Sequence, residues 1–168
     1  AQVQNQLDEL NRAFSNYYMP NGASSVNTGI RFCLAQTRPD GTAFNGINRI
    51  ASSRTVHPRW QDDSIRNLIH YPTDEYVNIY VVDQITDSSG SNSGVLGYAS
   101  YPYWGGRVND MVVIRHDWFG KKSAAYPVLD NLAEGKILVH EMGHYLGLFH
   151  PFEQQCSGLD STTCATQG

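Results

Sequence analysis

The chain has 168 residues, of which 40% are hydrophobic and 17% charged, and its formal net charge is −4. This length forms one domain with a sizeable core, and the composition excludes a disordered chain. The absence of any run of lysine or arginine argues against a nucleic-acid or anionic-membrane partner, and no apolar stretch approaches the roughly 18 residues of a membrane-spanning helix. Abundant Asn, Ser, Gly and Tyr favour a secreted globular protein.

The first half of the chain predicts one long helix followed by short elements. Apolar residues recur at helical spacing over residues 3–18, and the Met-Pro-Asn-Gly sequence at 19–22 ends that helix. Apolar and polar residues alternate over 28–35, which predicts a half-buried strand. Residues 47–56 are a further candidate strand, and 62–69 a short helix.

The second half of the chain predicts three strands. Residues 76–82 are almost all apolar or β-branched, which is typical of a strand covered on both faces. Shorter apolar runs at 95–100 and 110–115 predict two more strands. A helix, then strands, then a second long helix indicate an α/β domain with a twisted, mostly parallel sheet.

The strongest chemical signal is His140-Glu141-x-x-His144-x-x-Gly147-x-x-His150. Residues four apart share one face of a helix, so His140 and His144 can both bind one zinc ion. His150 can join them only if the helix ends and the chain turns back, and Gly147 tolerates the positive φ that this turn needs. Three histidines leave the fourth zinc position open to water, which is the pattern of catalytic sites. Glu141 then lies beside that water as general base.

The predicted zinc-binding helix covers residues 132–146, with Asp130 or Asn131 as its N-cap. A lone H-E-x-x-H occurs by chance on ordinary helices, but the spaced glycine and third histidine make coincidence a poor explanation. The neighbouring apolar residues predict a buried helix; they are Ile137, Leu138, Leu146, Leu148 and Phe149.

Two histidines and three cysteines lie outside the motif. His57 and His70 could bind metal, although a surface or hydrogen-bonded role is the commoner one for a single histidine. Cys156 and Cys164 are disulfide candidates, either with each other or with cysteines on another segment, and Cys33 in its strand-like run is expected to be a buried free thiol.

The sequence resembles the pappalysin family of the metzincin zinc endopeptidases. The resemblance extends over about residues 6–152 and is carried by the zinc motif and by segments similar to the family's strands and first loop; these are 30–35, 39–41, 46–47, 75–82, 96–102 and 110–114.

The resemblance implies a metzincin-like zincin fold, with a long N-terminal helix, a central zinc-binding helix and a five-stranded, mostly parallel sheet with one antiparallel edge strand. Residues 1–168 would form one catalytic domain, in which 1–146 are the upper subdomain and 147–168 begin the lower one. The edge strand would form the upper rim of a cleft and pair with an extended peptide. Its expected substrate-binding residues are Leu96, Gly97, Tyr98 and Ala99.

The implied activity is zinc-dependent hydrolysis of internal peptide bonds in protein substrates outside the cell. Only 18 residues follow His150 and none is methionine, so the family's methionine turn and most of its calcium-binding segment are not expected here. Calcium is possible but unsupported by these residues, and an associated C-terminal fragment is a possible partner. The alternatives are a non-catalytic zinc-binding module that needs such a segment, and a zinc esterase or amidase. Intact Glu141 argues against the first, and the edge strand against the second.

Overall fold

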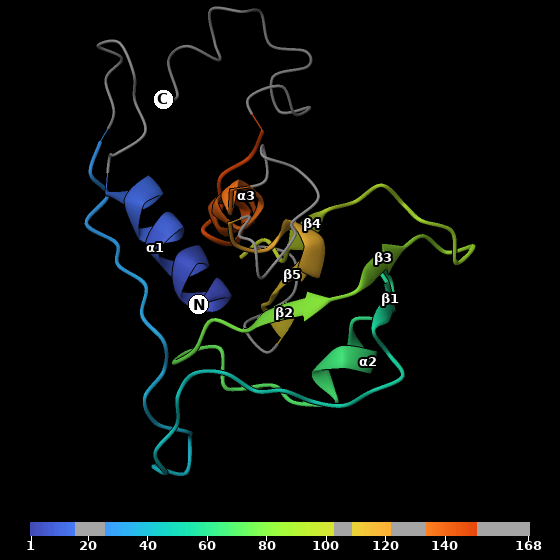
Figure 1. The fold of residues 1–168 in the computed structure, drawn as a ribbon, viewed down its shortest axis with the longest axis horizontal. Coiled ribbons are helices and arrows are strands. Elements are labelled where there is room, and N and C mark those ends of the chain that lie inside the picture. Colours follow the sequence, from blue (N-terminus) through green and yellow to red (C-terminus); the bar gives the residue numbers. More distant parts are fainter. Residues whose placement is uncertain (16–25, 103–108, 122–133, 151–168) are drawn as a thin grey trace, which may run out of the picture.

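The computed structural model describes residues 1–15, 26–102, 109–121 and 134–150 (Figure 1). Along the chain the elements are α1 (Gln2–Phe14), β1 (Val56–Pro58), α2 (Asp63–Arg66), β2 (Ile79–Val82), β3 (Gln84–Thr86), β4 (Gly97–Ala99), β5 (Val112–Arg115), the 3-10 helix η2 (His116–Trp118) and α3 (Lys136–Tyr145). Within these ranges, none of the helices has the length and apolarity needed to cross a membrane. The predicted division at 146/147 stays a prediction.

The strands form two small sheets. One has the order β2-β5-β4, with β2 parallel and β4 antiparallel to β5, and the other is the parallel pair β1-β3. The antiparallel edge strand is as predicted, but the five strands of the described ranges do not form one sheet. The division falls at Asp83, between β2 and β3, where the amides of Asp83 and Gln84 donate to the carbonyl of Thr55 and draw β3 towards β1.

The strand predicted at residues 28–35 is not formed. The N–H of Phe32 donates to Asn11 Oδ1 at 2.7 Å, and Asn11 Nδ2 donates to the carbonyl of Phe32 at 2.9 Å. A side chain of α1 therefore takes the backbone groups that a neighbouring strand would pair with, and the ring of Phe32 packs edge-on against Phe14. Cys33 is a free thiol as expected, but it is exposed rather than buried.

The strand β2 is covered on one face only, contrary to the prediction for residues 76–82. Val82 is buried, whereas Ile79 and Val81 remain 37% and 46% exposed. The physical reason is that β2 is an edge strand whose second face carries no helix among the described residues. Of the other predicted elements, the strand at 47–56 is reduced to the start of β1, and the helix at 62–69 to the single turn α2.

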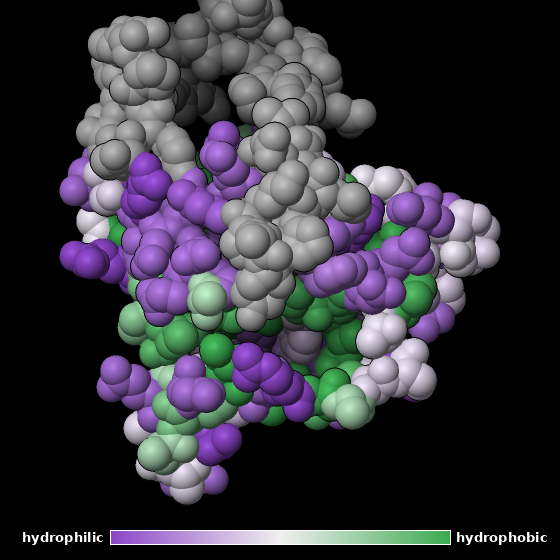
Figure 2. Space-filling view, viewed as in Figure 1, coloured by the Kyte–Doolittle hydropathy of each residue, from purple (hydrophilic) through white to green (hydrophobic). Residues whose placement is uncertain are grey.

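The core lies on both faces of β5. Alternate β5 side chains point to opposite faces. Those on the α1 and α3 side belong to one cluster, which consists of Leu10, Val112, Ile114, Phe119, Leu138 and Met142. The opposite face holds Ile65, Val82, Ile85, Met111 and Val113. Full burial of a side chain such as Met142 contributes about 1.5–3 kcal/mol. The outer surface of α1 is mostly hydrophilic, and hydrophobic side chains gather below it in the region of β2 (Figure 2).

Candidate metal centre

The helix that carries the motif begins at Lys136, four residues later than predicted. Its N-cap is Gly135 with φ 77°, so the cap is neither Asp130 nor Asn131, both of which lie outside the described residues. The carbonyl of Gly135 accepts from Gln6 Nε2 at 2.9 Å, and Gln6 Oε1 accepts from the amide of Gly120. A Cβ on Gly135 would lie 2.9 Å from Gln6 Nε2. Helix α1 therefore fixes where α3 begins.

The end of α3 is a Schellman turn. Gly147 has the predicted positive φ, at 94°. Its amide donates to the carbonyl of His144, and the amide of Leu148 donates to that of Gly143, both at 2.9 Å. These two bonds satisfy the free carbonyls at the helix end and reverse the chain towards its own last turns.

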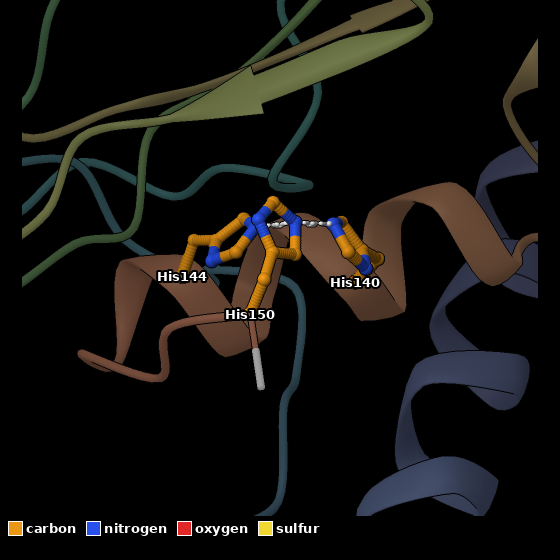
Figure 3. A group of neighbouring side chains, drawn as sticks. All are labelled: His140, His144 and His150. Atoms are coloured by element: carbon orange, nitrogen blue, oxygen red, sulfur yellow. Dashed lines mark hydrogen bonds between the residues drawn. The ribbon is translucent and has the colours of Figure 1, made fainter. Parts of the chain in front are cut away.

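The reversal brings three imidazoles together (Figure 3). His140 and His144 project from α3, and His150 returns from the turn. Each pair of their Nε2 atoms is 3.0 Å apart. His144 is 8% exposed, His150 is half-buried and His140 faces solvent. The geometry thus unites the three residues that the sequence selected.

The protonation of His144 is set by its second ring nitrogen. Nδ1 lies 2.7 Å from the carbonyl oxygen of Leu148, an acceptor only, so Nδ1 carries the proton and Nε2 presents a lone pair to the cluster. The hydroxyl of Tyr101 is 2.8 Å from the same nitrogen, and its ring stacks on Phe149. Sequence reasoning missed both partners. The turn at Gly147 could have indicated the Leu148 carbonyl, but nothing local indicates Tyr101.

The three nitrogens fit a metal ion. Neutral imidazole lone pairs that face one another repel unless a cation lies between them. The partial burial of the His140 ring, together with the charges of His144 and His150, lowers the pKa of His140 and favours its neutral form. Three ligands about 2.0–2.1 Å from one ion at tetrahedral angles are roughly 3.4 Å apart, so the 3.0 Å separations need only a small expansion. An all-nitrogen set suits zinc among several transition metals.

Glu141 is the buried carboxyl beside the cluster, at 8% exposed. Burial raises its pKa to about 7, against opposing effects of the charges of His150 and Arg59. A Cβ on Gly97 of β4 would lie 3.1 Å from Glu141 Cγ. Glu141 is therefore held between the histidine cluster and the edge strand.

The edge strand β4 presents only some of its backbone outward. The amide of Ser100 donates to the carbonyl of Met111, and the amide of Arg115 to that of Leu96, so Leu96, Tyr98 and Ser100 face β5. By the same alternation, the N–H and C=O groups of Gly97 and Ala99 face away from β5, on the side where no other strand of the described residues pairs with β4. Of the four predicted substrate-binding residues, these two have backbone groups that β5 does not use, and their role in binding stays a prediction.

Other candidate residues do not join the centre. His57 bonds Asp62 and Tyr98, and His70 bonds Tyr80, so both have the hydrogen-bonded role that the sequence favoured. Cys156 and Cys164 lie outside the described residues.

The apolar residues after α3 are not buried as predicted. Leu146, Leu148 and Phe149 are 43%, 65% and 38% exposed, because they lie at and beyond the helix end, where the chain leaves the core.

The fold and the site together define a metzincin-like α/β domain with a three-histidine candidate metal centre. Residues 60–167 match the model of the M43 peptidase family, which is described as Pregnancy-associated plasma protein-A. The chain belongs to this family.

Solved and curated relatives agree with this assignment. The structure is similar to that of Tannerella forsythia mature mirolysin in complex with a cleaved peptide, with a TM-score of 0.75 and 28% identity over 95% of this chain and 62% of that one. An extracellular metalloprotease of Verticillium alfalfae is 32% identical over 71% of this chain and 41% of its own length. One from Arthroderma benhamiae is 27% identical over 98% of this chain and 50% of its own. The chain spans half or less of these two curated relatives.

Proposed function

We propose that the protein is a secreted zinc-dependent endopeptidase that hydrolyses internal peptide bonds. The observation that carries the proposal is the convergence of three Nε2 atoms, each pair 3.0 Å apart, beside a buried carboxyl. Membership of the M43 family supports it, as do relatives named extracellular metalloproteases. His140, His144 and His150 would hold the metal and Glu141 would act as general base.

Different residues of the site would have different roles in the reaction. Zinc, when bound, supplies Lewis acidity that polarises a carbonyl oxygen and acidifies water. The Glu141 carboxylate accepts a proton from the attacking water and then delivers it to the nitrogen of the leaving amine. A carboxyl with a pKa of about 7 exchanges protons well in both directions near neutral pH. The Leu148 carbonyl and the Tyr101 hydroxyl hold the His144 ring in the orientation that ligation needs.

The substrate would be an extended peptide paired with β4. Gly97 and Ala99 offer backbone donors and acceptors that do not depend on the substrate's side chains, so many sequences could bind. The structure of mirolysin, to which this chain is similar, is a complex with a cleaved peptide, which supports a peptide as the substrate. The chain spans half or less of its curated relatives. The proposed partner, besides the substrate, is an associated C-terminal fragment of the same precursor that completes the cleft.

Casein digestion tests the proposal. The zinc-loaded protein should cleave casein, lose activity with a chelator and regain it with zinc. Glu141→Gln should keep its zinc and lose activity by about a thousandfold or more, because it removes the proton acceptor. Retained zinc without cleavage by the wild-type protein would favour the non-catalytic module. Cleavage that a chelator does not affect, or a fully active Glu141→Gln protein, would refute the proposal.

A further inference from the structure

Tyr98 is the only large side chain of β4. The strand is three residues long, and Tyr98 lies between Gly97 and Ala99, which have little side chain to pack. Its ring packs against the cluster on the face of the sheet opposite α3. The position of the open backbone groups of Gly97 and Ala99 therefore depends on how firmly Tyr98 is held.

A partly buried network of hydrogen bonds holds the Tyr98 hydroxyl. Tyr98 Oη donates to Asp62 Oδ1 at 2.5 Å. His57 Nε2 lies 2.8 Å from Tyr98 Oη and 3.2 Å from Asp62 Oδ1. Since the tyrosine hydrogen is directed at the carboxylate, His57 Nε2–H is the donor to the phenol oxygen. His57 belongs to β1 and is completely buried, and Asp62 is the N-cap of α2.

The network joins the edge strand to a different part of the fold. Among the strands of the described residues, β4 pairs with β5 alone, whereas His57 belongs to the β1-β3 sheet and Asp62 caps α2. Burial, with the adjacent Asp62 carboxylate, raises the pKa of Tyr98 well above its ordinary value, so the hydroxyl remains a donor at every physiological pH. Loss of that hydroxyl would leave the buried His57 Nε2 with only the Asp62 carboxylate, 3.2 Å away, and would release β4 from both residues.

We infer that Tyr98, held by Asp62 and His57, is a positioning residue that keeps β4 in the form that pairs with an extended peptide. The inference rests on the proposed function, because it concerns the same cleft. A strand already fixed in its binding geometry loses less conformational freedom when a peptide binds, so the network increases affinity without touching the substrate.

Tyr80 supplies a matched control. Its hydroxyl lies 2.8 Å from His70 Nδ1 and donates to the carbonyl of Ile69 at 2.7 Å. The tyrosine and histidine ring centroids are 6.3 Å apart in both networks. Tyr80, however, lies in β2, at the edge of the sheet opposite β4. Tyr80→Phe therefore removes a similar hydroxyl without disturbing the proposed peptide edge.

The test compares Tyr98→Phe with Tyr80→Phe in the zinc-loaded protein. The first readout is steady-state cleavage of an eight-residue casein peptide and of its four-residue core around the cleaved bond. Tyr98→Phe should raise KM for the octapeptide about five- to tenfold, the equivalent of one lost hydrogen bond, and leave kcat within about twofold. The tetrapeptide has only two residues on each side of the cleaved bond and can form fewer bonds with β4, so Tyr98→Phe should change its KM less than twofold. Tyr80→Phe should leave KM and kcat of the octapeptide within about twofold.

Peptide binding separates this inference from the activity. The Kd of the octapeptide is measured on Glu141→Gln with and without Tyr98→Phe, and the double variant should bind about five- to tenfold more weakly. If the wild-type protein cleaves nothing but this difference appears, the proposed activity fails and the positioning role stands. Equal effects of the two tyrosine variants, equal effects on long and short peptides, or no octapeptide binding at all would overturn the positioning role.

Discussion

The Nδ1 atom of His144 lies 2.7 Å from the carbonyl oxygen of Leu148, four residues further along the chain. The same Leu148 donates its amide to Gly143 as part of the turn that ends α3. One turn therefore ends the helix, orients a predicted ligand and returns His150 to the other two histidines. Substitutions in this turn are therefore expected to change the affinity for the metal.

Gly147→Ala should weaken zinc binding. Gly147 has φ 94°, and a side chain in the left-handed region costs about 1–2 kcal/mol. Relief of that strain moves the Leu148 carbonyl and His150, so zinc affinity should fall about tenfold in competition with a chromogenic chelator. Gly90→Ala is the control, because Gly90 has φ 81° with open space around it. If both variants bind zinc as tightly as the wild type, the turn does not set the ligand geometry.

Tyr101→Phe should weaken zinc binding by a smaller amount. The variant keeps the ring that stacks on Phe149 but removes the hydroxyl 2.8 Å from His144 Nδ1. Because the Leu148 carbonyl still orients the imidazole, we expect zinc affinity to fall only about three- to tenfold. This is at or below the low end of the effects usually seen when a hydrogen-bond partner of a metal ligand is removed. The same chelator competition measures it, and an unchanged affinity would show that the hydroxyl plays no part in ligation.

Gly97→Ala should destabilise the protein and reduce cleavage. The new Cβ would lie 2.6 Å from Ile114 Cδ1, 3.0 Å from the Val113 carbonyl oxygen and 3.1 Å from Glu141 Cγ. The carbonyl belongs to the sheet and cannot move freely, so overpacking should cost about 1–3 kcal/mol and displace Glu141. Urea unfolding measures the loss of stability, and casein cleavage by the protein that remains folded measures the loss of activity. An alanine variant with wild-type stability would contradict the close approach of β4 to α3.

Glu141→Gln should change the pH dependence of stability in the metal-free protein. Burial raises the pKa of Glu141 from 4.5 to about 7, so the folded state binds this proton more tightly than the unfolded state. Stability from this group is therefore present below pH 4.5 and is lost as pH rises through about 7. Above that pH the glutamine variant should be more stable than the wild type, by roughly 3 kcal/mol.

Thermal unfolding in a chelator at pH 5 and at pH 8 measures this difference between the two proteins. The Tm values should differ more at pH 8 than at pH 5, with the glutamine variant higher. A variant that is less stable at pH 8 would show that the carboxylate is stabilised in the folded protein.

The sequence by itself determined the features that depend on local spacing. Two histidines four apart share a helix face, and a glycine three residues later ends the helix, whatever surrounds them. Short apolar runs likewise located β4 and β5. These predictions succeeded because backbone geometry over a few residues fixes them.

Only the tertiary structure decided the partners that lie far apart in the chain. Tyr101 reaches His144 across 43 residues, and Tyr98 reaches His57 across 41. Asn11 takes the backbone bonds of Phe32 and prevents the predicted strand, and Gln6 fixes the start of α3. No local sequence pattern predicts these bonds. Each one forms only when packing brings two distant segments together, and neither segment's sequence indicates which other segment it will contact.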